Sequence, residues 1–299
     1  MTASRFAGIR ALGMAALLLA AALPLPGQTA PPGTDVFLVP LRQDGTRLGV
    51  GDPVNLTARA GYDNQPAFTS DGLALLYSTI GADGHADVCR NLLATRARFC
   101  WNTTPESEYS PASAPRGGIS VVRVERDSAQ RLWAFRDDGT PGLLLPGLKP
   151  VGYYAWIDAD RVAAFVLGTP ATLQLADLRN GTATMIASDI SRSIQRMPGG
   201  SGISFQQREG DGWLIRKLDP ATGQVTTITP GLPGSDFHAW MPDGTLLMAR
   251  GDELFSWHVG ETQWRLVAAF AADGLRQITR LAVSPDGRSL AFVAEDPGA

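Results

Sequence analysis

The chain has 299 residues, 44% of them hydrophobic and 18% charged, with a formal net charge of −3. This composition is typical of a globular protein with enough chain to bury a large core. The small acidic excess provides no basic stripe to neutralise phosphates, so we expect no nucleic-acid partner.

The first 30 residues have the pattern of a secretory signal peptide with a short linker. Arg5 and Arg10 make the start basic, and residues 11–23 form an apolar run that is too short to span a bilayer. An uncleaved anchor helix is the alternative, and the sequence leaves the cleavage site open. We therefore expect an exported protein, periplasmic or secreted. It would keep no membrane span after signal removal and would form a single domain over residues 31–299.

Two strand-like segments open this expected domain, at 35–41 and 53–57, with the turn residues Gln43-Asp-Gly-Thr46 between them. A degenerate phrase then returns about every 43 residues. The six copies end at residues 72, 117, 160, 200, 244 and 287, which gives steps of 45, 43, 40, 44 and 43. A period of this size indicates a repeat architecture.

Each copy of the phrase precedes short apolar segments that are separated by turn residues. The first of these segments lies at 74–77, 119–124, 162–166, 203–205, 246–248 and 290–293. In the first five repeats a third strand and a less regular fourth strand follow. Each repeat is then a four-stranded antiparallel meander, the blade of a β-propeller. We therefore predict an all-β fold, a six-bladed β-propeller.

The sixth phrase is followed by only one more strand, at 289–294. The two spare N-terminal strands would complete that blade. We therefore expect both ends of the chain to share one blade and to close the ring without an open sheet edge. A fragment of a longer protein is the alternative.

The chain has two cysteines, Cys89 and Cys100, on either side of an apparent hairpin. If they lie opposite each other, Ala94 and Thr95 form the hairpin tip, and export would favour a disulfide. A metal site would need further Cys or His nearby, and a redox pair usually shows Cys-x-x-Cys. We predict a structural disulfide over these two alternatives.

The phrase itself resembles the repeats of TolB-type six-bladed propellers. The copies that carry the resemblance read Phe68-Thr-Ser-Asp-Gly72, Trp240-Met-Pro-Asp-Gly244 and Val283-Ser-Pro-Asp-Gly287. The resemblance covers residues 35–294 and implies a periplasmic or secreted interaction scaffold. The separate N-terminal domain of TolB and the hydrolase domain of prolyl-oligopeptidase-type enzymes are not expected here, so a role in a Tol system is not carried over.

Few residues have the pattern of catalytic or metal-binding chemistry. Ser201 lies in a Gly-Gly-Ser-Gly run but lacks the following helix of a nucleophile elbow. The three histidines, His85, His238 and His258, are not at metal-ligand spacing. We therefore expect no catalytic residue, no metal and no cofactor.

The residues just before each phrase are the candidate binding site. In a propeller the first strand of each blade lines the central channel, so the starts of these strands converge at one mouth. The candidates at this mouth are Asp63, Asn64, Glu108, Tyr109, Tyr153, Tyr154, Arg192, Asp236, Phe237, His238 and Arg280. Aromatic residues with a few convergent polar groups suit a peptide or a small ligand.

These observations favour a non-catalytic scaffold that acts as a monomer and binds another protein, a peptide or a ligand at the channel mouth. One alternative is an enzyme of lyase or glycoside hydrolase type with its site at the same mouth, because fold does not fix function. Another is a domain that senses a ligand or a metal.

Overall fold

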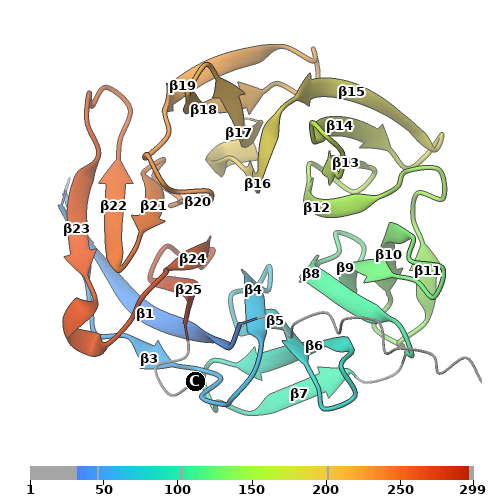
Figure 1. Cartoon of the computed structure of the whole chain (residues 1–299), viewed down its shortest axis with the longest axis horizontal. Coiled ribbons are helices and arrows are strands. Elements are labelled where there is room, and N and C mark those ends of the chain that lie inside the picture. Colours follow the sequence, from blue (N-terminus) through green and yellow to red (C-terminus); the bar gives the residue numbers. More distant parts are fainter. Residues whose placement is uncertain (1–31, 46, 102–103, 201, 296–299) are drawn as a thin grey trace, which may run out of the picture. The chain divides into compact units, whose positions relative to one another are not determined.

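Six antiparallel sheets surround a central axis in the computed structural model (Figure 1). The structure describes residues 32–45, 47–101, 104–200 and 202–295. These residues belong to the second of two compact units, 1–30 and 31–299, and the predicted signal peptide lies outside them. Within the described ranges the regular structure consists of six sheets and two short 3-10 turns, without an α-helix. This confirms the predicted all-β, six-bladed propeller.

Five blades are made of four consecutive strands each. Blade 1 contains β4 (Asp63–Phe68), β5 (Ala74–Ile80), β6 (Ala86–Leu92) and β7 (Arg98–Trp101). Blade 2 contains β8 (Ser107–Ser113), β9 (Ile119–Val124), β10 (Gln130–Phe135) and β11 (Pro141–Leu143). Blade 3 contains β12 (Val151–Trp156), β13 (Arg161–Val166), β14 (Thr172–Asp177) and β15 (Thr182–Ser188). Blade 4 contains β16 (Ile190–Arg196), β17 (Ile203–Glu209), β18 (Gly212–Leu218) and β19 (Val225–Pro230). Blade 5 contains β20 (His238–Trp240), β21 (Leu246–Arg250), β22 (Glu253–Trp257) and β23 (Arg265–Ala269). Two short 3-10 turns, Pro198–Gly200 and Ala271–Asp273, lie between strands.

Blade 6 combines segments that are far apart in sequence. It contains β24 (Thr279–Val283), β25 (Ser289–Glu295) and β1 (Thr34–Asp44), and β1 pairs with β25 in the register Thr34↔Glu295 to Pro40↔Ser289. Two short strands, β2 (Arg47–Val50) and β3 (Val54–Asn55), also pair with β1, in place of the single strand predicted at 53–57. Pro53 has no backbone N–H to donate, which favours an interruption at this point.

The repeated phrase forms the turn between the first and second strands of a blade. In blade 1 the Asp71 carboxylate accepts hydrogen bonds from the Thr69 hydroxyl and from the backbone N–H of Leu73. These bonds, the Thr69 bond first, lower the pKa of Asp71. Gly72 follows with a φ of 71°, a left-handed conformation that favours glycine. The Asp-Gly letters are therefore turn chemistry.

Five apolar clusters fill spaces between neighbouring blades. They lie between blades 2 and 3, 3 and 4, 4 and 5, 5 and 6, and 6 and 1. Each cluster joins side chains from the facing sides of two sheets, as sheet faces pack in other layered β folds. The core of this protein is thus divided into wedges between blades.

The predicted disulfide is present. Cys89 on β6 and Cys100 on β7 are directly opposite each other, and their sulfurs are bonded. The bond links the third and outer strands of blade 1. None of the helical turns in the described ranges is long and apolar enough to cross a membrane.

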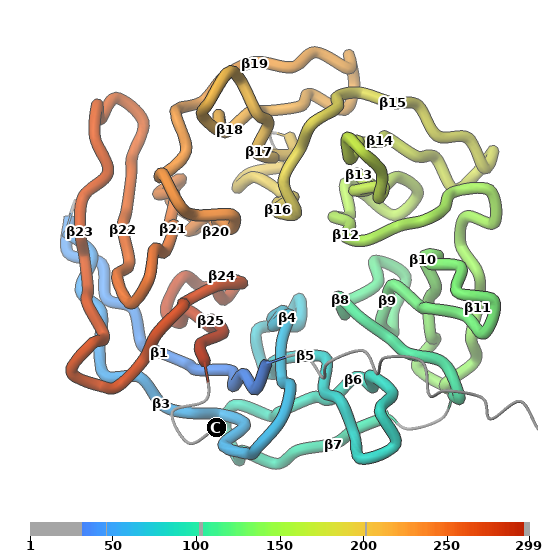
Figure 2. The backbone as a smooth tube through the Cα atoms, in the orientation of Figure 1, coloured from blue at the N-terminus to red at the C-terminus, as the bar shows by residue number. Residues whose placement is uncertain are grey.

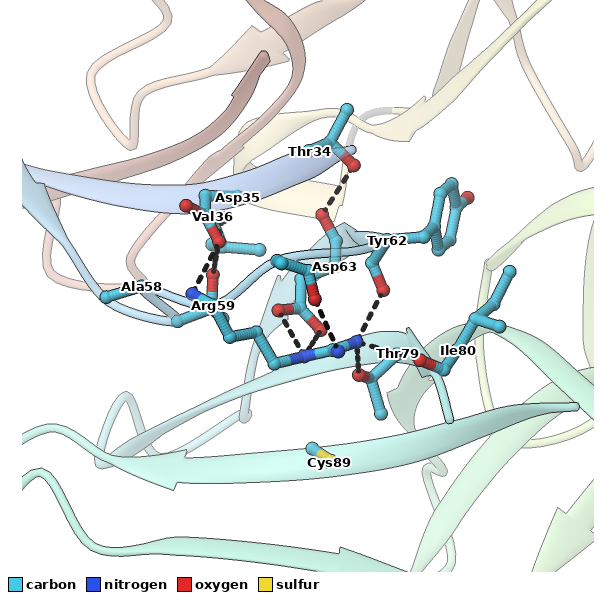
Figure 3. Close-up of polar contacts among 12 residues, drawn as sticks. Thr34, Asp35, Val36, Ala58, Arg59, Tyr62, Asp63, Thr79, Ile80 and Cys89 are labelled. Atoms are coloured by element: carbon cyan, nitrogen blue, oxygen red, sulfur yellow. Dashed lines mark hydrogen bonds and ion pairs between the residues drawn. The ribbon is translucent and has the colours of Figure 1, made fainter. Parts of the chain in front are cut away.

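A buried ion pair joins the start of β4 to its surroundings (Figure 3). Arg59 Nε lies 2.9 Å from the carboxylate of Asp63, whose side chain is fully buried. Arg59 Nη2 donates to the carbonyl oxygens of Tyr62 and Ile80, at 3.1 and 2.9 Å. The Thr34 hydroxyl donates to the Asp63 carbonyl at 3.0 Å. The guanidinium therefore ties the ends of β4 and β5 together beside the first residue of β1.

Asp35, which follows Thr34 on β1, is a second buried carboxylate. Asp35 accepts hydrogen bonds from the side chains of Thr57 and Asn55, each at 2.7 Å, and is 1% exposed. These bonds hold the segment that leads from β3 into blade 1. Together the two carboxylates attach blade 6 to blade 1.

Replacing Arg59 tests this attachment. In Arg59→Ala the Asp63 carboxylate would remain buried without a counter-charge, which costs about 3–5 kcal/mol of unfolding free energy. Urea unfolding would measure the loss. Arg179→Ala removes an exposed partner of Asp177 and should leave stability nearly unchanged. Equal stability of the two variants would contradict a structural role for Arg59.

Candidate functional site

The first strands of all six blades line a central channel of about 460 Å³. In the backbone trace β4, β8, β12, β16, β20 and β24 lie nearest the centre (Figure 2). The residues that directly precede the phrase in five blades are Gln65, Ser110, Tyr153, Phe237 and Arg280, and in blade 4 Arg192 lies one position earlier than these; all six line the channel. We call this set the channel mouth. Residues brought together from six repeats thus share one opening.

Arg280 is the centre of an aromatic cluster at the channel mouth. Its guanidinium lies 4.8 Å from the ring centroid of Tyr153 and 4.2 Å from that of Phe237. Arg280 Nη2 also donates to the Tyr153 hydroxyl at 2.9 Å, a contact between residues 127 positions apart. Three of the predicted candidates, from blades 6, 3 and 5, therefore contact one another.

Several first strands change register at this end. The shifts lie between Asn64 and Ala67 in β4, Tyr109 and Ala112 in β8, and Thr279 and Ala282 in β24. Such β-bulges turn side chains in a new direction.

Within these bulges three non-glycine residues have positive φ. Gln65, Ser110 and Arg280 have φ of 58°, 52° and 56°. This left-handed conformation is unfavourable for residues with a Cβ, and all three line the channel. The chain is therefore strained at the same place in three blades.

Sequence reasoning missed Tyr62, which comes directly before β4. Burial raises the pKa of Tyr62 to about 12, the charge of Arg280 opposes this rise, and Tyr153 and Tyr109 add to it. These electrostatic effects indicate that the three tyrosines and Arg280 are neighbours. The signal in the sequence is an aromatic residue four positions before the phrase, one position upstream of the predicted candidates.

The remaining exposed candidates differ in position. Arg192 is exposed and lines the channel. Asp236 is exposed but lines a second pocket of about 300 Å³ with Gln277 and Thr279, which adjoins the channel at Phe237. Tyr154 lines the channel, yet its hydroxyl donates to Ser120 Oγ at 2.8 Å, and burial raises its pKa. Tyr154 therefore joins blade 3 to blade 2 as well as facing the channel.

Three of the predicted polar candidates are buried away from the channel surface. Asp63 pairs with Arg59, and Asn64 donates to the Thr34 hydroxyl at 3.2 Å. Glu108 accepts from Arg123 Nε at 3.0 Å, and burial raises the pKa of Glu108. The expectation that these groups are available at the mouth is corrected, because the strands turn them toward neighbouring backbone and blades.

His238 is also buried, in the junction between blades 4 and 5. Its Nε2 lies 2.7 Å from Ser204 Oγ, and Trp240 Nε1 donates to the same oxygen at 2.7 Å. The serine hydroxyl also donates to the Gln195 carbonyl oxygen at 3.4 Å, so the direction of its bond with His238 Nε2 follows the tautomer of the ring. Burial lowers the pKa of His238 to about 3, which keeps the ring neutral. His238 is therefore bonded within a junction between blades and is not a group at the mouth.

The same junction recurs between blades 2 and 3. There Ser120 Oγ accepts from Tyr154 Oη and Trp156 Nε1, both at 2.8 Å. The partners are 34 and 36 residues apart in sequence, as they are for Ser204, so the repeat places them alike. His85 and His258 are exposed, and Ser201 lies outside the described residues. Across the described ranges no group of three or more His, Cys, Asp or Glu could hold a metal ion.

The junction predicts a pH dependence of stability. Because the pKa of His238 is about 3 when folded and about 6.5 when unfolded, the unfolded chain takes up the proton first. The His238 contribution is complete above about pH 6.5 and falls by about 1.4 kcal/mol per pH unit toward pH 3. Urea unfolding of His238→Gln across this window should show a shallower slope than wild type. Identical slopes would contradict the junction.

Known structures share this fold. A structure described as TolB from Agrobacterium tumefaciens matches with a TM-score of 0.68 and 15% identity, over 90% of this chain and 100% of that one. Oligogalacturonate lyase in complex with manganese matches with a TM-score of 0.55 and 14% identity, over 83% of this chain and 82% of that one. TolB from Acinetobacter baumannii matches with a TM-score of 0.53 and 14% identity, over 88% of this chain and 64% of that one.

At these identities the matches describe the fold. No protein-family model matches the sequence, and a search of curated proteins finds no match. The predicted likeness to TolB is confirmed at the level of architecture. The chain has a TolB-like six-bladed β-propeller fold, which TolB structures share with a lyase.

Proposed function

We propose that the protein is an exported, monomeric binding scaffold that holds a segment of another protein or a peptide at its channel mouth. The observation that carries this proposal is the repeated strain there. A non-glycine residue in the left-handed region costs on the order of 1–3 kcal/mol and persists where the surrounding structure fixes it. Gln65, Ser110 and Arg280 carry this strain at equivalent bulges.

The chemistry of the channel mouth suits a chain segment with carboxylates. Arg280 and exposed Arg192 supply positive charge, and Tyr153 and Phe237 supply aromatic surface. Arginine with tyrosine is the composition that dominates binding energy at protein interfaces. The cluster is already assembled by contacts among its own residues, which reduces the ordering cost of binding.

The groups that could have served an enzyme at this mouth have other partners. The carboxylates of Asp63 and Glu108 are paired with arginines, and His238 is bonded to a serine. This arrangement supports binding over catalysis. Export is supported by the disulfide between Cys89 and Cys100, since such bonds persist in oxidising compartments.

Arg280→Gly tests the proposal directly. Glycine adopts positive φ without strain, and this gain offsets the lost contacts with Tyr153 and Phe237, so the unfolding free energy should stay within about 1 kcal/mol of wild type. The same change removes the guanidinium, so binding should weaken about tenfold or more. Thermal unfolding and capture of partners from a periplasmic extract would measure the two effects.

Gln277→Gly is the matched control. Gln277 also has a positive φ, of 53°, but lines the second pocket and does not line the channel. Gln277→Gly should have the same thermal stability as Arg280→Gly. It should capture partners as well as wild type does. If Arg280→Gly captures partners as well as wild type, the site is elsewhere on the ring. If it instead loses a thermal shift given by a sugar or a metal ion, the ligand-sensing alternative replaces the protein scaffold.

A further inference from the structure

The space between blades 1 and 2 differs from the other spaces in the ring. Five spaces contain apolar clusters, and among the described residues no such cluster joins blades 1 and 2. A cavity of about 720 Å³ lies there instead, larger than the channel of about 460 Å³. Small-molecule sites usually have volumes of about 300–1,000 Å³.

A single residue of blade 2 accounts for part of the cavity. The last residue of the first strand is Phe68 in blade 1, Trp156 in blade 3 and Trp240 in blade 5, and each packs against the preceding blade. Blade 2 carries Ser113 at this position, paired with Ile119. A small side chain therefore stands where three other blades use an aromatic ring, and the space it leaves is part of the cavity.

The blade 1 wall of the cavity presents a positive charge. Arg90 pairs with Phe99 in the sheet, and its guanidinium lies 5.7 Å from the Phe99 ring and 5.6 Å from the Trp101 ring. Arg90 Nε is buried and has no hydrogen-bond partner among the described residues. A buried donor without an acceptor is unfavourable. The wall is therefore suited to an anionic group that would accept a hydrogen bond from Arg90 Nε.

The opposite wall and the rim have a different character. Ile119 and Phe135 of blade 2 provide apolar surface, and the buried Glu108, which is already paired with Arg123, also lines the cavity. The exposed lining residues, which form the rim, include one arginine, Arg136, and three carboxylates, Asp71, Asp137 and Asp138. Each of the three carboxylates uses its Oδ1 to accept a hydrogen bond within its own turn or from Gly118. Hydrogen bonds lower the pKa of Asp71 and Asp138, so both are charged at neutral pH. The rim is therefore suited to a cation.

We propose that this cavity binds a short peptide with free termini and an apolar side chain. The carboxylate binds Arg90, the ammonium group lies at the acidic rim, and the side chain packs between Trp101 and Phe135. A simple anion would be repelled by the rim, and a simple cation by Arg90. A zwitterion with an apolar body satisfies both walls and the rim. The cavity shares Thr69, Ser70 and Ser113 with the channel wall, but none of the channel-mouth residues lines it.

The dipeptide Ala-Phe is the probe, with Ala-Phe amide and N-acetyl-Ala-Phe as its matched controls. The amide lacks the carboxylate and the acetylated form lacks the ammonium group. Calorimetric titration of the purified protein should show saturable binding of Ala-Phe and weakening of about tenfold or more for each control. Absence of Ala-Phe binding, or equal binding of all three compounds, would overturn the proposal.

Variants locate the binding within the molecule. Arg90→Gln should lose Ala-Phe affinity about tenfold or more, because the charged partner is removed. Arg98→Gln removes a neighbouring charge on the other face of blade 1, where Arg98 stacks on Tyr77, and should bind like wild type. Equal binding by both variants would place the site elsewhere.

A filling variant keeps the test independent of Arg90. Ser113→Phe places in blade 2 the ring that blade 1 carries at Phe68, and should block the cavity while thermal stability is kept or raised. A folded Ser113→Phe protein that still binds Ala-Phe would overturn the proposal. Circular dichroism and thermal unfolding establish that each variant is folded.

Discussion

Every blade of this propeller must bury both faces of its sheet against two neighbours, and the rest of the structure depends on how it does so. Apolar clusters fill five of the spaces between blades. Polar groups inside these spaces are acceptable only when they are bonded, which explains the two serine junctions at Ser120 and Ser204. The Arg59–Asp63 pair meets the same requirement where blade 6 meets blade 1.

This requirement separates two kinds of polar residue at the strand starts. Residues that turn toward a neighbouring blade become structural, as Glu108 and His238 do. Residues that a bulge turns toward the axis line the channel, as Arg280 does. Both kinds lie within a few positions of one another in the chain. Three of the six channel-mouth residues, Gln65, Ser110 and Arg280, combine this position with a strained backbone.

Positions that differ among the repeats change the packing between blades, whereas the shared positions build the same turn in each blade. The Asp-Gly letters build equivalent turns, and the glycines at 72, 244 and 287 all have positive φ. Where copies differ, the space between blades changes, as it does when Ser113 replaces an aromatic residue. A repeat protein can therefore form a cavity without changing its backbone plan.

The sequence by itself determined the number of blades, the order of strands within them, and the pairing of Cys89 with Cys100. These features depend on local periodicity and turn chemistry, which act within one repeat. Tertiary structure decided which residues before the phrase face the channel, because a bulge changes the face on which a side chain lies. It also decided the partners of Asp63 and His238 and the cavity beside Arg90. Each of these depends on what a neighbouring blade or segment presents across the gap, and no single repeat contains that information.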